Sequence, residues 1–143
     1  MGSHFVEELL KLGAEIVCIS KSVEKRNFSV KKISSSHLHF RKIDLLDFAG
    51  VKKGIGSADV LINCSALDGN TEFKMKHAAE MMDVNVRITL NILNAARERK
   101  INNIVLVSTA EIYSPLAESP IVEEDDHRKY NDYIGNGYVL SKR

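Results

Sequence analysis

Short apolar runs alternate with stretches of helical periodicity along this chain. The apolar runs are short enough to be buried strands, and they occupy residues 14–20, 59–64 and 102–109. Residues 37–43 alternate well enough between apolar and polar side chains to predict a further strand. The periodic stretches predict helices at residues 5–12, 47–54 and 71–100, and a last helix that begins near Tyr138. Residues 21–36 are polar and are expected to be an exposed connection. Residues 114–137 hold both prolines and an acidic cluster and are expected to be a loop.

This alternation predicts an α/β fold with a parallel sheet, because parallel strands need crossover helices. The long stretch 71–100 carries two apolar stripes, so this helix is expected to be buried on more than one side. Ligands of such sheets bind at the carboxyl ends of the strands. The residues that follow the strands are therefore candidate site residues: Ser20, Asp44, Ser65 with Ala66, and Thr109.

Composition narrows the class of protein. At 143 residues, with 44% hydrophobic and 27% charged residues, the chain is expected to form one soluble domain. A net charge of +1 argues against nucleic-acid and membrane-surface partners, and no apolar run approaches the roughly 20 residues of a membrane span. Two cysteines in strand-like runs, no metal-ligand spacing and no secretion signal favour a cytoplasmic protein without a metal site.

Tyr138 and Lys142 form the most informative pair. They are four residues apart, so they lie on one face of a helix, about one turn from each other. A nearby ammonium favours phenolate over phenol, and it is expected to draw the tyrosine pKa down from about 10 toward neutrality. The pair would then provide an acid/base catalyst at cellular pH.

Several short motifs occur in a fixed order around this pair. They are Gly2-Ser3-His4, Asp44-Leu45, Asn63-Cys64-Ser65-Ala66, Asp83-Val84-Asn85-Val86, Ser108 to Tyr113, and Tyr138-x-x-x-Lys142. This order and spacing resemble the extended short-chain dehydrogenase/reductase family, in particular the NAD-dependent epimerase/dehydratase group that acts on nucleotide sugars. The resemblance covers essentially the whole chain and implies a Rossmann-like, doubly wound parallel sheet.

The resemblance implies a role for each catalytic residue. Tyr138 would be the general acid/base that exchanges a proton with a sugar hydroxyl while hydride moves to or from the nicotinamide. Lys142 would lower the pKa of Tyr138 and hydrogen-bond the nicotinamide ribose. Thr109 would hydrogen-bond the same substrate oxygen as Tyr138.

The resemblance also implies a set of cofactor contacts. Asp44 would accept from the adenine amino group with Leu45 beside it, although a strand-end cap is an equal alternative for Asp44. Ser65 and Ala66 would pass close to the phosphates and ribose. Asn85 would support the site from the long helix, or it could simply satisfy buried backbone groups.

Two positions depart from the family pattern. Members that prefer NAD usually have an acid where this chain has Ser20, which is followed by Lys21 and, nearby, Lys25 and Arg26. A hydroxyl and cations suit the extra phosphate of NADP, so the pattern favours NADP slightly; a solvated loop is the alternative.

The second departure lies at Glu111. It stands where sugar dehydratases of the family place a base, yet Ala110 replaces the aspartate with which one large dehydratase subgroup expels the leaving group. Epimerisation, reduction, dehydration by another arrangement and decarboxylation therefore stay open, and Glu111 could be a plain polar residue. The acidic run 123–126 is expected to be a solvated loop.

The ends of the chain suggest a fragment. Gly2 resembles the last glycine of the family's Gly-x-x-Gly-x-x-Gly turn, whose earlier part and preceding central strand are not present. Residues 1–143 would form a partial dinucleotide-binding domain without the C-terminal substrate domain, and would bind cofactor poorly and turn over nothing. The parent would form a homodimer through the long helix and the Tyr138 helix. The rival hypothesis is a non-catalytic NAD(P)-binding regulatory module or a gene relic.

Overall fold

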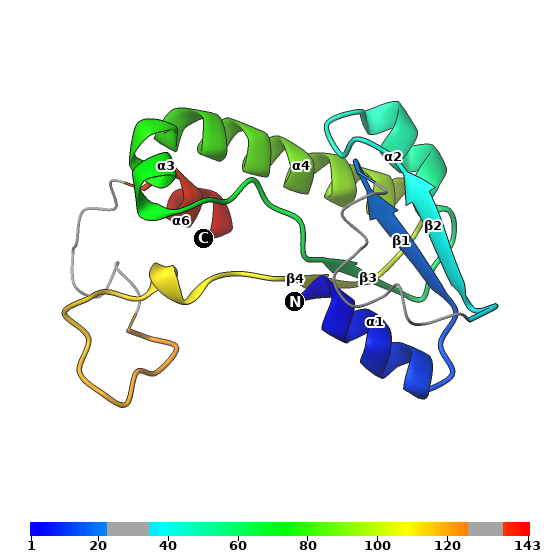
Figure 1. Cartoon of the computed structure of the whole chain (residues 1–143), viewed down its shortest axis with the longest axis horizontal. Helices are drawn as coiled ribbons and strands as arrows, with labels where there is room; N and C mark the ends of the chain where they lie inside the picture. The colour runs from blue at the N-terminus through cyan, green and yellow to red at the C-terminus, as the bar shows by residue number, and fades with distance from the viewer. Residues whose placement is uncertain (23–34, 126–135) are drawn as a thin grey trace. The chain divides into compact units, whose positions relative to one another are not determined.

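The computed structural model describes residues 1–22, 35–125 and 136–143 (Figure 1). Its contacts divide the chain into two compact units. The first unit contains residues 1–64 and 90–105, and the second contains residues 65–89 and 106–143. The long helix α4 (Ala78–Glu98) contributes residues to both.

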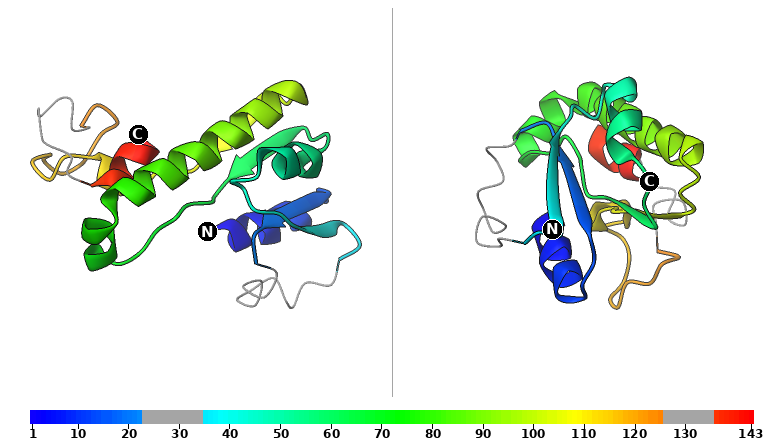
Figure 2. Two further views of the ribbon diagram at one scale, coloured as in Figure 1. Left: turned by 90° about the horizontal axis from the view of Figure 1, so that it is seen from above. Right: turned by 90° about the vertical axis from the view of Figure 1, so that its right-hand side faces the viewer.

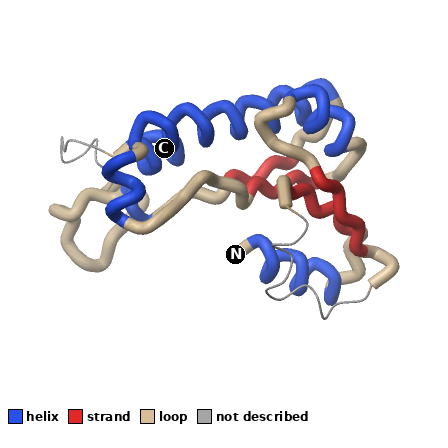
Figure 3. Tube along the Cα trace, turned by 45° about the horizontal axis from the view of Figure 1, so that its top comes forward, coloured by secondary structure: helices blue, strands red, loops and turns tan. Residues whose placement is uncertain are grey.

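The described residues of the first unit form four strands in two separate pairs. Its elements are α1 (Gly2–Lys11), β1 (Ile16–Ser20), β2 (Leu38–Lys42), α2 (Phe48–Ile55), β3 (Val60–Asn63) and β4 (Asn103–Leu106), whose last residue belongs to the second unit. Strands β1 and β2 are parallel, with Ile16 opposite Leu38 and Ser20 opposite Lys42. Strands β3 and β4 form the second pair (Figure 3). The parallel α/β arrangement predicted from the sequence is confirmed for β1 and β2.

The sheet is not continuous across the first unit. Among the described residues, β1 is hydrogen-bonded to β2 and β3 to β4, with no ladder that joins the two pairs. This break falls where the sequence predicts that a central strand is missing. Large apolar side chains on the strands stay partly open to solvent, since Val17 is 39% and Val60 50% exposed. The buried core of this unit is formed by Val6, Val51, Ile92, Ala95, Ala96 and Ile101.

The second unit is mostly helical. It contains α3 (Thr71–Lys76), the first turns of α4, the 3-10 turn η3 (Ala110–Ile112) and the short helix α6 (Gly137–Lys142). Met81, Tyr138 and Val139 are buried together, and Ala66, Leu67, Phe73 and Ile112 pack against them. Helix α6 lies beside α3 and the start of α4 (Figure 2), so Tyr138 is part of the core of this unit.

Three predicted elements need correction. The expected helix 71–100 is two helices, α3 and α4, because His77 leaves helical geometry with φ −118° and stacks its ring on Phe73. Helix α1 begins at Gly2 rather than at residue 5. In the acidic run, Asp125 is buried rather than solvated, because its carboxylate accepts a hydrogen bond from the Val122 N–H at 3.0 Å.

Within the described parts of the chain, no helix is both long and apolar enough to cross a membrane.

Candidate active site in the second unit

Tyr138 is held in place by the residues just before it. The Asn136 side chain caps α6 by accepting from the Tyr138 N–H at 2.9 Å. At Gly137, an added Cβ would lie 1.7 Å from the carbonyl oxygen of Ala78, which is a backbone atom that cannot swing away. Glycine therefore allows α6 to rest on the first turn of α4. As a result Tyr138 is only 8% exposed, next to Met81.

A partly buried cation lies over the Tyr138 ring. The Lys74 Nζ is 4.3 Å from the ring centroid, a cation–π distance. The same ammonium donates to Glu111 Oε1 and lies 3.4 Å from Asp68 Oδ1. The second oxygen of Glu111 accepts from Asn136 Nδ2 at 3.3 Å. Glu111 is thus tied both to α3 and to the cap of α6.

The surroundings of Tyr138 raise its pKa above the ordinary value of 10.0. Burial is the largest cause, and the negative charges of Asp68 and Glu111 act in the same direction. The charge of Lys74 and a side-chain hydrogen bond with Thr109 lower the pKa but do not outweigh them. The predicted lowering of the Tyr138 pKa toward neutrality is therefore wrong for this structure, because desolvation and two carboxylates dominate.

Lys74 keeps its charge although much of its side chain is removed from solvent. Its side chain is 13% exposed. Burial lowers the pKa of Lys74. The hydrogen bond and charge of Glu111, together with Asp68, raise the pKa by more than burial lowers it, so the net shift is upward. The cation over Tyr138 is therefore permanent at physiological pH.

The Lys142 ammonium is hydrogen-bonded to main-chain oxygens in the segments that follow two strands. Its Nζ donates to the carbonyl oxygens of Ser65 at 3.3 Å and Val107 at 3.2 Å, in the segments after β3 and β4. The Ser108 hydroxyl in turn donates to the Lys142 carbonyl at 3.0 Å. The ammonium thus lies at the strand ends, where the sequence places the ligand.

Asn85 organises the segment that contains Ser65 and Ala66. Its Oδ1 accepts from the Leu67 N–H at 2.6 Å, and its Nδ2 donates to the Leu67 carbonyl at 3.0 Å. The side chain is 2% exposed, so it satisfies buried backbone groups, which was one of the two roles expected for it. Thr109 has a similar local role, because its Oγ1 accepts from the Glu111 N–H at 3.3 Å and caps η3.

The first unit brings together the residues expected near the adenosine. Lys21 Nζ lies 2.9 Å from Asp44 Oδ2, and Asp44 Oδ1 accepts from the Leu46 N–H at 3.0 Å. The hydrogen bond from Lys21 is the largest cause that lowers the Asp44 pKa, followed by that from Leu46. Asp44 therefore caps its turn, as one alternative predicted.

The remaining residues predicted for the cofactor also lie in the first unit. The Ser20 hydroxyl donates to the Ser22 carbonyl at 3.1 Å, and the Leu45 carbonyl accepts from Asn91 Nδ2 at 2.9 Å. An added Cβ at Gly2 would meet Cys64 Cβ at 3.6 Å, an ordinary contact. Lys25 and Arg26 lie outside the described residues.

Comparison with protein families decides the affiliation. The model of the NAD dependent epimerase/dehydratase family matches residues 1–143. The chain belongs to this family. A curated relative from a Streptomyces species, named dTDP-4-dehydro-6-deoxy-D-allose reductase, is 34% identical over 99% of the chain and 44% of its own length. The chain thus spans less than half the length of this curated relative.

Solved structures of the epimerase/dehydratase type share the fold. An epimerase from Methanothermobacter thermautotrophicus superposes with a TM-score of 0.81 at 20% identity, over 99% of this chain and 40% of that one. A dTDP-glucose 4,6-dehydratase from Streptomyces venezuelae with NAD bound gives a TM-score of 0.79 at 20% identity, over 99% and 44%. At these identities the likeness establishes the fold.

The residues of the second unit fit a nicotinamide dinucleotide. The half-buried Lys142 ammonium, held by main-chain oxygens after β3 and β4, is the kind of donor that a ribose hydroxyl needs. The Thr109 side chain lowers the pKa of Tyr138, and the two hydroxyls could both hydrogen-bond one oxygen of a substrate. No metal-binding cluster of His, Cys, Asp or Glu occurs among the residues that the structure describes.

The sequence did not indicate Lys74, Asp68 or Gly137. Lys74 and Glu111 are 37 positions apart, so no local spacing relates them. Gly137 carried a usable signal, because a glycine inside the first turn of a helix is unfavourable unless another backbone approaches closely.

Proposed function

We propose that this chain is the dinucleotide-binding part of a longer NAD(P)-dependent enzyme that changes a nucleotide-linked sugar at Thr109, Tyr138 and Lys142. The observation that carries the proposal is the placement of Tyr138 and Lys142 on α6, with Tyr138 in the core of the second unit and Lys142 hydrogen-bonded to the main chain after β3 and β4; the Thr109 side chain acts on the Tyr138 pKa. A module without catalysis would not need this pair, which makes the enzyme the better hypothesis than a regulatory module or relic.

Each residue has a defined task. The Tyr138 hydroxyl gives a proton to, or takes one from, a sugar oxygen, and the Thr109 hydroxyl orients that oxygen. Lys142 binds the ribose and adds positive charge to the site when the cofactor is present. The nicotinamide supplies or accepts the hydride at the sugar carbon. Ser65 and Ala66 line the path of the cofactor, on a segment fixed by Asn85.

Reduction of a keto sugar is the favoured reaction. The relative at 34% identity is named a reductase of a dTDP-linked 4-dehydro-6-deoxy sugar. In reduction the carbonyl carbon gains hydride and the carbonyl oxygen gains the Tyr138 proton, so no leaving group is expelled. Ala110 lacks the acid that would expel one. Epimerisation is the second candidate, since it uses the same Tyr138 proton exchange.

Product mass separates the possible reactions. The full-length protein is incubated with a nucleotide-linked 4-keto-6-deoxy sugar and reduced cofactor, and the mass of the sugar nucleotide is then measured by mass spectrometry. Reduction adds two hydrogen atoms, epimerisation leaves the mass unchanged and dehydration of the corresponding hydroxy sugar removes water. We expect the gain of two hydrogens. Absence of any mass change with the keto sugar and with the corresponding hydroxy sugar, together with no epimer separable by chromatography, would refute the proposed function.

The 143-residue chain by itself is proposed to be inactive. The support is the split sheet of the first unit, which leaves apolar strand residues such as Val17 and Val60 partly exposed. Saturable micromolar binding of NAD(P)H to the purified chain, measured by fluorescence, would refute this. The complete protein is proposed to be a cytoplasmic homodimer, which sedimentation of that protein tests.

The most specific part of the proposal is a preference for NADP over NAD. Ser20 and Lys21 provide a hydroxyl and a cation at the end of β1, and Lys21 already binds Asp44. Both cofactors are titrated against the full-length protein and its Lys21→Ala variant. We expect tighter NADP binding that Lys21→Ala weakens, and tighter NAD binding in the unaltered protein would overturn the preference.

A further inference from the structure

Among the ion-paired cations that the structure describes, Lys74 has the least exposed side chain. Its side chain is 13% exposed, whereas its partners Glu111 and Asp68 are 44% and 51% exposed. Burial of an ammonium is costly unless charge partners surround it. These partners come from separate segments: Asp68 follows β3, Glu111 lies in η3, and the Tyr138 ring belongs to α6. Lys74 therefore joins the parts that build the site.

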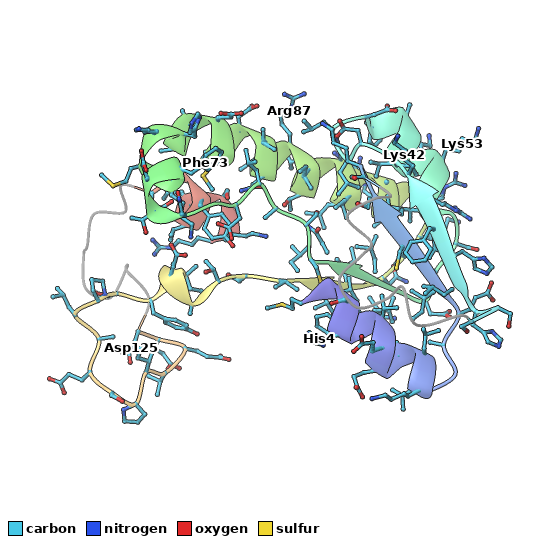
Figure 4. The ribbon with its side chains drawn as sticks, viewed as in Figure 1. His4, Lys42, Lys53, Phe73, Arg87 and Asp125 are labelled. Carbon is cyan, nitrogen blue, oxygen red and sulfur yellow. The ribbon has the colours of Figure 1, made fainter. Side chains whose placement is uncertain are left out.

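The direction of Lys74 on α3 distinguishes it from its neighbours. Figure 4 shows Phe73, the preceding residue, on the α3 that lies beside α6. Lys76, two residues further along, pairs with Glu72 at 2.7 Å on the same helix and is 68% exposed. Arg87 on α4 pairs with Asp83 at 3.3 Å and projects away from α6 (Figure 4). Lys76 thus offers a matched control of the same charge on the same helix.

Lys74 commits Glu111 to an ion pair. Glu111 Oε1 accepts from Lys74, and Oε2 accepts from Asn136 Nδ2 at 3.3 Å. A general base must come within hydrogen-bond reach of the proton that it removes. Each oxygen of Glu111 therefore already has a donor, so a proton from a substrate carbon would have to reach an oxygen that it shares with Lys74 or Asn136. Tyr138 and Thr109 are not held in such ion pairs, and the Thr109 side chain acts directly on the Tyr138 phenol by lowering its pKa.

We propose that Lys74 is a positioning residue that determines the reaction of this site, because it holds Glu111 as a counter-ion and leaves proton transfer to Tyr138. The inference rests on the proposed function and makes it more specific. Reduction and epimerisation need a proton exchanged only at the sugar oxygen. Elimination needs a second base, which takes a proton from the carbon next to the ketone while hydroxide leaves and is protonated to water. Lys74 disfavours that second proton transfer.

The first test measures the ionisation of Tyr138 in the 143-residue chain, independently of any activity. The tyrosine rings are labelled with ¹³C, and the Tyr138 signal is assigned with Tyr138→Phe. The groups that act on the phenol are Asp68, Lys74, Glu111 and Thr109 from facing segments, and Lys142 on its own helix is the cation expected from the sequence to act on it. Lys74→Met should raise the Tyr138 pKa, because the two carboxylates then act unopposed, and Glu111→Gln should lower it.

The controls separate charge from packing. Lys74→Arg should restore most of the original titration, and Lys76→Met should leave it unchanged. If Lys74→Met does not fold, Lys74→Gln provides the same loss of charge with a polar chain. A Tyr138 pKa that is the same in the unaltered chain and in the folded neutral variant, within the error of the titration, would overturn the proposal.

The second test detects carbon acidity directly. The full-length protein is incubated in D₂O with a nucleotide-linked keto sugar and oxidised cofactor, and deuterium at the carbon next to the ketone is followed by NMR. Lys74→Met should raise this exchange about tenfold or more over the unaltered protein and over Lys76→Met, and added Glu111→Gln should abolish the gain. No gain in Lys74→Met would overturn the role of Lys74. Failure of the unaltered protein to convert any keto sugar when it is supplied with reduced cofactor would instead refute the proposed function.

Discussion

The surroundings of Tyr138 and the corner at Lys21 and Asp44 use similar groups in different settings. In the second unit, Lys74 is 13% exposed and is held by Glu111, Asp68 and the Tyr138 ring. In the first unit, Lys21 is 76% exposed and its ion pair with Asp44 is a surface contact. Solvent screens the Lys21–Asp44 pair far more than it screens the ion pairs of Lys74. The fold itself therefore fixes the geometry around Tyr138, whereas a bound ligand could readily rearrange the Lys21 corner.

The largest expected effect is at the two glycines that begin helices. Gly137→Ala should destabilise the second unit by about 3 kcal/mol, because the new Cβ would collide with the Ala78 carbonyl at 1.7 Å. Gly2→Ala in the first unit should change stability by less than about 1 kcal/mol, since its Cβ would sit 3.6 Å from Cys64. Urea unfolding monitored by circular dichroism compares the two. Equal losses would show that α6 is not held by this backbone approach.

The next contrast uses two asparagines on α4. Asn85→Ala should cost about 2–3 kcal/mol, because the N–H and C=O of Leu67 lose their partners in a buried place. Asn91→Ala removes one hydrogen bond, to the Leu45 carbonyl, and should cost about 1 kcal/mol. Chemical unfolding of both variants gives the comparison, and a smaller loss for Asn85→Ala than for Asn91→Ala would contradict it.

Alkaline pH should affect the second unit through Tyr138. The folded pKa of Tyr138 is raised above its unfolded value of 10.0, so the unfolded chain loses this proton first. The stabilisation is complete below pH 10.0 and is lost as pH rises from there through the folded pKa. The free energy of unfolding, measured across this window, should fall less steeply for Tyr138→Phe than for the unaltered chain. Identical slopes would show that the Tyr138 environment is not as described.

The smallest stability effect is expected at the surface pair of the first unit. Lys21→Ala should change stability by no more than about 0.5 kcal/mol at neutral pH. The folded pKa of Asp44 lies below 3.8, so the contribution of this carboxylate is present above pH 3.8 and is lost as pH falls through the folded pKa. Thermal unfolding at neutral and acidic pH measures both. A loss above about 1 kcal/mol for Lys21→Ala would place this corner in the same class as the Tyr138 site.

Local patterns in the sequence predicted much of the fold. The strands at residues 16–20 and 60–63 lie inside the predicted runs, because β-branched apolar residues between turn residues have few alternatives. The strand at residues 38–42 was found from its alternation of apolar and polar residues. The predicted helix 71–100 was wrong at His77, since its apolar stripe continues through the break. Periodicity reports which face is buried and does not report a one-residue change in backbone direction.

The site was predictable only where a motif is local. Tyr138 with Lys142, and Thr109 with Glu111, are close in sequence, and the structure places each pair within one helix or turn. The raised Tyr138 pKa was not predictable, because it arises from burial and from Asp68 and Glu111, which approach from distant segments. Lys74 escaped notice for the same reason.

The role of Tyr138 is tested most directly by removing its hydroxyl in the full-length protein. With a nucleotide-linked keto sugar and reduced cofactor, Tyr138→Phe should lower kcat by about 10²- to 10⁴-fold while KM changes little. Tyr113→Phe, four residues after Thr109, should keep nearly full activity. A Tyr138→Phe enzyme whose kcat stays within a few-fold of the unaltered protein would contradict the assignment of Tyr138 as the proton-transfer group.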